Sequence, residues 1–120
     1  MYEVEIYEDR NGKSEIAEWI EALNIKARTS KDSRIRLKKI AEYTELLKAY
    51  GVQVGKPAVE HITGTELWEL RPSNDRIFFA YWKDNKFVLL HHFVKKTQKT
   101  PTREIEKAKK ILADFLERSE

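Results

Sequence analysis

Four basic residues lie at the ends of predicted strands, where they can gather into one cluster. Arg71 ends the first of three strand-like runs, Arg76 opens the second, and Lys95 and Lys96 follow the third. Strand ends that meet at tight turns lie close in space, so these cations can converge although they are distant in sequence. Arginine presents a planar fork that matches phosphate oxygens, and lysine acts as a compact cation. Such a cluster could neutralise the charge that builds on a phosphodiester during its cleavage.

Acidic neighbours offer a structural explanation for the same arginines. Glu69 and Asp75 lie beside Arg71 and Arg76 on either side of the turn at residues 72–75. If the arginines form ion pairs across this turn, they stabilise the fold and do not bind a ligand. Both explanations are open from the residues alone.

Two adjacent histidines in the third run are candidates for proton transfer, because histidine titrates near neutral pH. His91 and His92 are neighbours in a strand, so their side chains should point to opposite faces. Strict alternation would place His91 with Leu89 and Phe93, and His92 with Leu90 and Val94. Which face is the core is open at this stage.

The elements that must position these residues follow from composition and periodicity. Residues 67–71, 76–82 and 87–94 are rich in β-branched and aromatic residues and are separated by turn-forming residues, which predicts three antiparallel strands. An alternating strand at residues 2–7 precedes them, and helical spacing predicts helices from Ser14 to about Ala27 and from about Thr29 to Tyr50. Residues 51–66 should form a connection, with any local structure at 59–62. Thr100 should cap a last helix with Pro101 at its first position.

This order predicts a single α+β domain over residues 1–120, with the sequence β-α-α-β-β-β-α, a small antiparallel sheet, a helical hairpin and a C-terminal helix. The last helix is expected to bury one apolar stripe, made of Ile105, Ala108, Leu112, Phe115 and Leu116.

The composition narrows the class of protein. Charged residues make up 36% and hydrophobic residues 41% of the chain, as in soluble globular proteins. No apolar run approaches the length of a membrane helix, and residues 1–9 lack the features of a signal peptide. With no cysteines and three histidines, we expect a cytoplasmic protein without a disulfide, a metal site or another cofactor.

The charge is unevenly distributed along the chain. Residues 1–25 carry seven acids and two bases, whereas residues 95–110 carry seven bases and two acids. A basic run is often only a solvated face, but one beside converging arginines favours a polyanionic partner. The phosphate-binding loop, dinucleotide, serine-hydrolase and zinc-protease motifs are absent from the sequence. Any cleavage of a nucleic acid would therefore depend on cations, histidine or tyrosine.

At these residues the sequence resembles the HigB branch of the RelE/ParE toxin superfamily, including its phage-derived relatives. The resemblance is carried by LWELR at 67–71, RIFFAYW at 76–82 and LLHHFVKKTQKTP at 89–101, and by Glu104, Ile105 and Ala108 in the last helix. One departure is His92, where many relatives carry a small residue. The resemblance implies a RelE-like fold and the toxin of a type II toxin–antitoxin pair, which enters the ribosomal A site and cuts mRNA there without a metal.

The resemblance also implies roles for particular residues. Arg71 and Arg76 would stabilise the phosphate in the transition state, and Lys95 and Lys96 would hold the RNA backbone and protonate the leaving oxygen. His91, or His92 if it faces the site, would be the base. The expected outer ring of RNA contacts consists of Lys56, Tyr81, Thr97 and Lys99.

The implied partners are mRNA in the ribosomal A site, the ribosome, and a HigA-like helix-turn-helix antitoxin that binds operator DNA for the pair. The acidic N-terminal strand and first helix are a hypothetical docking surface for that antitoxin. Two rival functions are open: inhibition of DNA gyrase without catalysis, as in ParE-like proteins, and nucleic-acid binding without cleavage.

Overall fold

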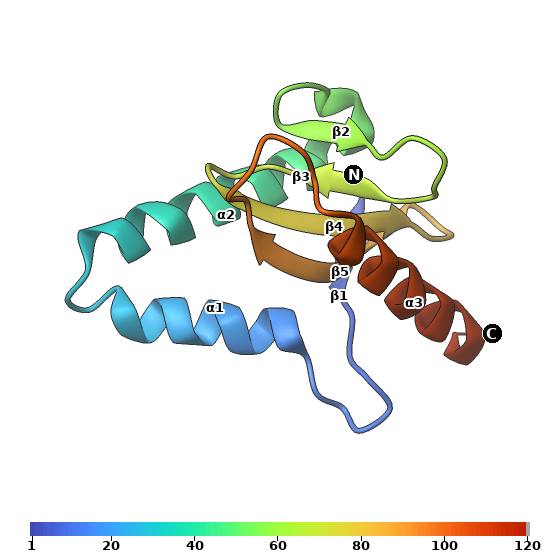
Figure 1. Cartoon of the computed structure of the whole chain (residues 1–120), viewed down its shortest axis with the longest axis horizontal. Helices are drawn as coiled ribbons and strands as arrows, with labels where there is room; N and C mark the ends of the chain where they lie inside the picture. The colour runs from blue at the N-terminus through green and yellow to red at the C-terminus, as the bar shows by residue number, and fades with distance from the viewer. Residues whose placement is uncertain (120) are drawn as a thin grey trace.

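The computed structural model describes residues 1–119, which form a five-stranded sheet with helices on both faces (Figure 1). The elements follow in the order β1 (Glu3–Ile6), α1 (Glu15–Lys26), α2 (Lys31–Tyr50), the 3-10 helix η1 (Gly51–Val54), β2 (Val59–His61), β3 (Trp68–Leu70), β4 (Asp75–Tyr81), β5 (Lys86–Val94) and α3 (Thr102–Arg118). In the sheet the strands are arranged β1-β5-β4-β3-β2. The predicted α+β class is confirmed.

The predicted helices and the three central strands agree with the structure to within a residue or two. The hydroxyl of Ser14 accepts a hydrogen bond from the amide of Ala17 and so caps α1, and Ser30 caps α2 in the same way through Ser33. Helix α2 ends at Tyr50, and Gly51 follows as its C-cap with a φ of +61°, which suits a residue without a side chain.

Three details of the prediction are wrong. The sheet is mixed and not all antiparallel, because β1 runs parallel to β5. The local structure expected at 59–62 is present as a short edge strand, β2. Pro101 rather than Thr100 is the N-cap of α3, since its carbonyl accepts the first helical hydrogen bonds. The hydroxyl of Thr100 instead donates to Glu69 of β3, at 3.1 Å. At the other end of α3, Leu116 is 36% exposed and does not join the buried stripe.

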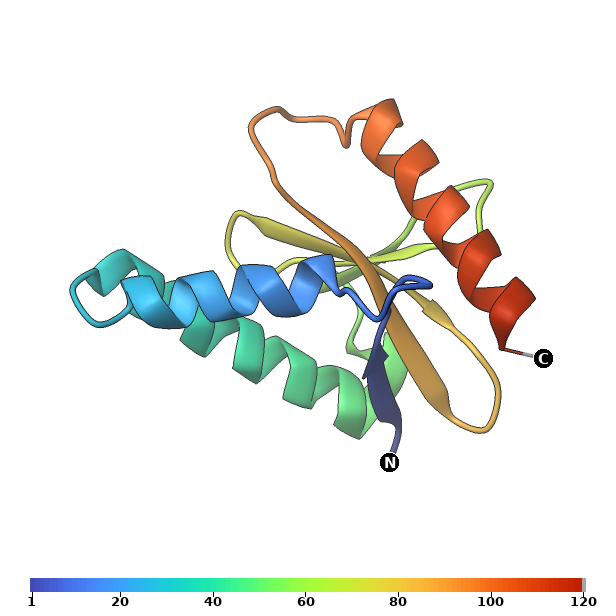
Figure 2. The same ribbon diagram turned by 90° about the horizontal axis from the view of Figure 1, so that it is seen from below.

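The two faces of the sheet bury separate cores. The α1–α2 hairpin covers one face, where the largest buried side chains include Ile16, Leu47 and Phe79. Helix α3 covers the other face, over Phe78 and Leu90. Figure 2 shows the hairpin and α3 on different sides of β5. Burial of this apolar surface is the main stabilising contribution, at roughly 25 cal/mol for each Å² removed from water.

A bulge in β5 corrects the predicted facing of the histidines. Phe78 pairs with His91 but Phe79 pairs with Leu89, so Leu90 has no partner in β4. The extra residue breaks the two-residue alternation, and Leu90 and His91 point to the same face. His91 therefore shares a face with Leu90 and Phe93 and not with Leu89.

Candidate active site

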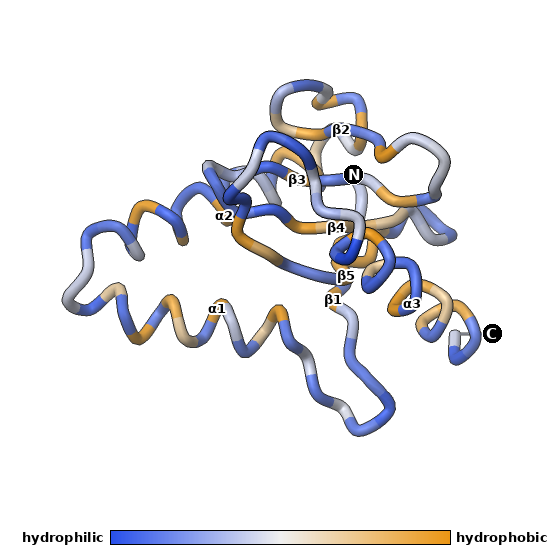
Figure 3. Tube along the Cα trace, in the orientation of Figure 1, coloured by the Kyte–Doolittle hydropathy of each residue, from blue (hydrophilic) through white to orange (hydrophobic). Residues whose placement is uncertain are grey.

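The predicted strand-end cations lie at one end of the sheet, on the face that α3 covers. Arg76 is the first side chain of β4 on this face, and Lys95 and Lys96 begin the loop from β5 to α3. The amide of Lys95 donates to the carbonyl of Asn74 at 2.9 Å, which holds this loop against the β3–β4 turn. Figure 3 shows the loop as mainly hydrophilic. The two segments enclose a polar pocket of about 410 Å³, here called the strand-end pocket, which is lined by Asn74, Arg76, Lys95, Lys96, Thr97 and Gln98.

Arg76 is held rigidly within this pocket. Its Nη1 donates to the carbonyls of Ser73, at 2.6 Å, and Asp75, at 2.9 Å. Its Nε is buried and has no hydrogen-bond partner among residues 1–119. Burial lowers the pKa of the Arg76 guanidinium, an effect that the carboxylate of Glu69 opposes and the charge of Arg71 reinforces. The buried Nε therefore lies on the side of Glu69, while Arg76 as a residue lines the strand-end pocket and supplies a guanidinium, the group that matches phosphate oxygens.

Glu69 links the two arginines and the end of the basic loop. Its carboxylate is fully buried and accepts hydrogen bonds from Arg71 Nε, at 2.7 Å, and from Thr100. The same Oε1 atom lies 3.9 Å from Arg76 Nε. Arg71 forms a second ion pair with Glu60, so it adopts the structural pairing that its acidic neighbours allowed. Arg71 is therefore engaged by these two carboxylates and is not among the residues that line the pocket.

The two histidines lie on opposite faces, as predicted, and both are bound to carboxylates. His91 is buried, and its Nε2 lies 2.7 Å from the carboxylate of Glu104 in α3. Its Nδ1 lies 3.3 Å from Glu15, which is within ion-pair distance, but this second contact lacks hydrogen-bond geometry. His92 lies on the hairpin face, where its Nε2 is 3.1 Å from Asp75 and its ring stacks on Trp19. Neither ring lines the strand-end pocket.

The remaining predicted RNA contacts are divided among three places. Thr97 lines the strand-end pocket and its hydroxyl donates to the carbonyl of Lys99, which is exposed on the same loop. Tyr81 lies at the opposite end of β4 from Arg76, about 16 Å away at strand spacing. Lys56 is exposed near β2, where it pairs with Glu60 at 3.3 Å. The structure thus brings together the loop residues but not Tyr81.

Sequence reasoning missed the residues that fix the turn behind Arg76. Arg36 of α2 makes two hydrogen bonds to the buried carboxylate of Asp75, at 2.7 and 3.0 Å. Burial raises the pKa of Asp75, but the hydrogen bonds from His92 and Arg36 outweigh it, so the pKa lies below its ordinary value of 3.8. Arg36 and Asp75 are 39 positions apart, and no local pattern could have paired them.

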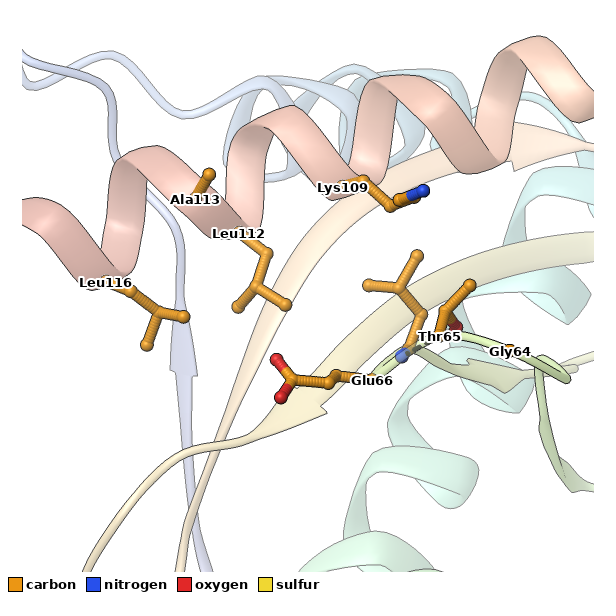
Figure 4. Close-up of a pocket in the computed structure, with 8 residues that line it drawn as sticks. Gly64, Thr65, Glu66, Lys109, Leu112, Ala113 and Leu116 are labelled. Atoms are coloured by element: carbon orange, nitrogen blue, oxygen red, sulfur yellow. Dashed lines mark hydrogen bonds between the residues drawn. The ribbon is translucent and has the colours of Figure 1, made fainter.

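A more apolar pocket lies elsewhere on the α3 face, between α3 and residues 64–67 (Figure 4). It has a volume of about 310 Å³, and Leu112, Ala113 and Leu116 form its helical wall. Lys109 is the one cation among its lining residues, and its Nζ lies 3.6 Å from Glu106. Its lining therefore suits apolar contact, and the strand-end pocket is the better candidate for phosphate chemistry.

The chain matches a family of phage-derived proteins. The profile of the family described as phage-derived protein Gp49-like (DUF891) matches residues 18–113, which include both arginines, both histidines and the basic loop. The chain belongs to this Gp49-like family. No curated protein matches the sequence.

Among solved structures, the chain is similar to one in the crystal structure of the archaeal RelE–RelB complex from Pyrococcus horikoshii OT3. The TM-score is 0.50 and the identity 21%, and the match covers 78% of this chain and 93% of the other. At this identity the likeness concerns the fold, so this Gp49-like chain has a RelE-like fold.

Proposed function

We propose that this Gp49-like protein is the toxin of a type II toxin–antitoxin pair, of the HigB branch, and that it cuts mRNA in the ribosomal A site. The observation that carries the proposal is the gathering of three cations, Arg76, Lys95 and Lys96, in the lining of one polar pocket. The RelE-like fold and the family membership support it.

The reaction would be a transesterification that uses the RNA as its own nucleophile. The 2′-oxygen attacks the adjacent phosphorus, the bond from phosphorus to the 5′-oxygen breaks, and a cyclic 2′,3′-phosphate and a 5′-hydroxyl result. The proton of the 2′-hydroxyl would pass to solvent water, and a lysine ammonium would give a proton to the leaving oxygen and regain one from solvent, so the reaction consumes no co-reactant. Arg76 would stabilise the negative charge on the phosphate oxygens, which is worth roughly 3–4 kcal/mol for a well-placed donor.

The lysines are better placed than the histidines for contact with the RNA. Lys95 and Lys96 line the pocket, whereas His91 and His92 face Glu104 and Asp75. We therefore assign the backbone contact and the proton for the leaving oxygen to the lysines. The histidines would act from behind the site, by fixing β5 to α3 and to the hairpin.

The proposed partners follow from the same function. The toxin would act in the cytoplasm on translating ribosomes, and a HigA-like helix-turn-helix antitoxin would neutralise it and bind operator DNA for the pair. None of the helices within residues 1–119 is long and apolar enough to cross a membrane.

Induced expression in a bacterial host tests the proposal. Primer extension should map new 5′ ends inside translated codons within minutes of induction, and the Lys96→Ala variant should weaken this cleavage strongly. Lys96 is exposed, so its replacement should leave the fold intact. Arrested growth with intact mRNA and damaged DNA would instead indicate gyrase inhibition, and intact mRNA with RNA binding alone would indicate a non-catalytic protein.

A further inference from the structure

The turn that joins α1 to α2 carries a second concentration of positive charge, separate from the strand-end pocket. Residues 24–39 contain seven bases and one acid, a net charge of +6, against +3 for the whole chain. Six of these bases are exposed and form what we call the hairpin tip, which consists of Lys26, Arg28, Lys31, Arg34, Lys38 and Lys39. Figure 1 shows the tip projecting from the sheet at the far end of the two helices.

The hairpin tip has no acidic partners within the described part of the chain. The ion pairs formed by residues 1–119 involve none of its six bases, whereas most bases elsewhere on the helices and strands pair with a nearby acid. Arg34 is held in place by a hydrogen bond of 2.8 Å from its Nη1 to the carbonyl of Ala27. The tip therefore presents its charges outwards rather than using them for internal pairing.

The placement of these bases on α2 works against the stability of the free helix. Lys31 and Arg34 lie in and next to the first turn, where the positive end of the helix dipole disfavours cations. Arg34 and Lys38 are four residues apart, a spacing at which like charges repel. A bound polyanion would remove both penalties, because it would neutralise the bases and lie at the positive end of the dipole.

The same bases share one face of α2. Lys31, Arg34 and Lys38 are spaced by three and four residues, and they lie opposite the buried stripe of Ser33, Ile40 and Leu47. Three cations in a row at helical spacing can follow a line of phosphates, which a nucleic acid supplies along each strand.

The row of cations is a surface separate from the strand-end pocket. Arg36 lies on the side of α2 that carries Ser33 and Ile40, and both of its hydrogen bonds go to Asp75. The small pocket of about 190 Å³ beside it is lined by Asp32, Arg36, Ser73, Asn74, Asp75 and Val94, and so includes two carboxylates. The regularly spaced phosphates of a nucleic-acid strand match the row of cations on the outer face of α2 better than a short acidic peptide does.

We propose that the hairpin tip is a docking surface for the phosphate backbone of structured RNA. It would anchor the protein while the strand-end pocket engages the strand to be cut. This inference rests on the proposed function in its choice of RNA, and it assigns a binding role to residues outside the reaction site.

The test compares two triple variants with the same change in net charge. The first, Lys31→Gln/Arg34→Gln/Lys38→Gln, removes one face of the hairpin tip. The control replaces three exposed lysines away from the tip and the strand-end pocket, as Lys83→Gln/Lys109→Gln/Lys110→Gln. Fluorescence anisotropy with an RNA duplex of about 20 base pairs, over a series of salt concentrations, measures the dissociation constant. Melting temperatures of all three proteins show whether each variant is folded.

The tip variant should bind the duplex about tenfold or more weakly at 0.1 M salt, and the slope of log affinity against log salt should fall by about 2–3. The control should stay within about twofold of the wild type. Equal losses in both variants would mean that net charge alone binds RNA and would overturn the proposal. Competition by polyglutamate as strong as by the RNA duplex would also overturn it, because the surface would then suit an acidic protein.

This assay is independent of cleavage. If the wild type cuts no mRNA on ribosomes, the proposed function fails, but duplex binding still decides the role of the tip. If cleavage occurs and both triple variants bind RNA like the wild type, the proposed function stands and the docking surface fails.

Discussion

The ion pair between Arg36 and Asp75 should be one of the largest single polar contributions to the stability of the protein. Asp75 is 1% exposed, and its carboxylate accepts two hydrogen bonds from Arg36 and lies 3.1 Å from His92 Nε2. Removing one partner of a buried pair costs about 3–5 kcal/mol, because the other charge loses its compensation. The Arg36 side chain is 26% exposed and can be partly hydrated. We therefore expect Asp75→Asn to lower the free energy of unfolding by about 2–3 kcal/mol at pH 7.

The contribution of Asp75 to the free energy of unfolding should depend on pH. The pKa of Asp75 in the folded protein lies below its ordinary value of 3.8, since His92 and Arg36 outweigh the effect of burial. The ionised carboxylate therefore stabilises the fold fully above pH 3.8, and this contribution is lost as the pH falls through the lower folded pKa. The stability difference between wild type and Asp75→Asn should narrow over that acid range.

Urea denaturation followed by circular dichroism, between pH 7 and the acid range, measures both effects. A double-mutant cycle with Arg36→Gln should give a coupling energy of about 1–3 kcal/mol. A change of less than about 0.5 kcal/mol in Asp75→Asn at pH 7 would refute the reasoning, as would a stability difference that does not vary with pH.

Three further predictions concern the rest of the fold. Phe78→Ala should lower the free energy of unfolding, measured by urea denaturation, by about 3–5 kcal/mol, because Phe78 is fully buried. Ile35→Ala, at a 47% exposed position, should change it by less than about 0.5 kcal/mol. Equal effects of the two substitutions would contradict the assigned core. Gly51→Ala should lower the free energy of unfolding by about 1–3 kcal/mol in the same assay, since φ is +61° and a Cβ atom would lie 2.8 Å from the ring of Tyr2. An unchanged urea midpoint of unfolding would argue against this packing. Asp114→Asn should lower the melting temperature at pH 7, and its melting temperature should approach that of the wild type near pH 2, because hydrogen bonds hold the pKa of Asp114 at about 2. A difference in melting temperature that stays constant down to that pH would contradict the hydrogen-bond assignment.

Local sequence patterns were sufficient to predict most of the fold. The caps at Ser14 and Ser30 and the turn residues between the central strands act within a few positions of the chain, so their effects can be read directly from the sequence. Local structure was predicted at 59–62, where β2 lies, but its strand character was not, because β2 has three residues and no repeating pattern and is formed by pairing with β3. The bulge at Leu90 was missed for a related reason, since register depends on the partner strand as well as on alternation.

The candidate site was only partly predictable. The sequence placed Arg76 with Lys95 and Lys96, because strand ends and short turns bring such residues together. It could not show that Arg71 is engaged by Glu60, or that Arg36 fixes the turn, since these contacts join elements distant in the chain. Burial also decides the role of a charged residue, and burial is a property of the folded protein.

We propose that the protein cuts mRNA on the ribosome with the residues of the strand-end pocket. The most direct measurement uses ribosomes programmed with a short labelled mRNA, with wild type, Lys96→Ala and Arg76→Lys compared under the same conditions. We predict rapid cleavage by the wild type to a cyclic 2′,3′-phosphate and a 5′-hydroxyl. Both variants should cleave at rates at least about 100-fold lower, with unchanged circular dichroism spectra. Cleavage by folded variants at the wild-type rate would contradict the assigned site, and intact mRNA with the wild type would contradict the proposed function.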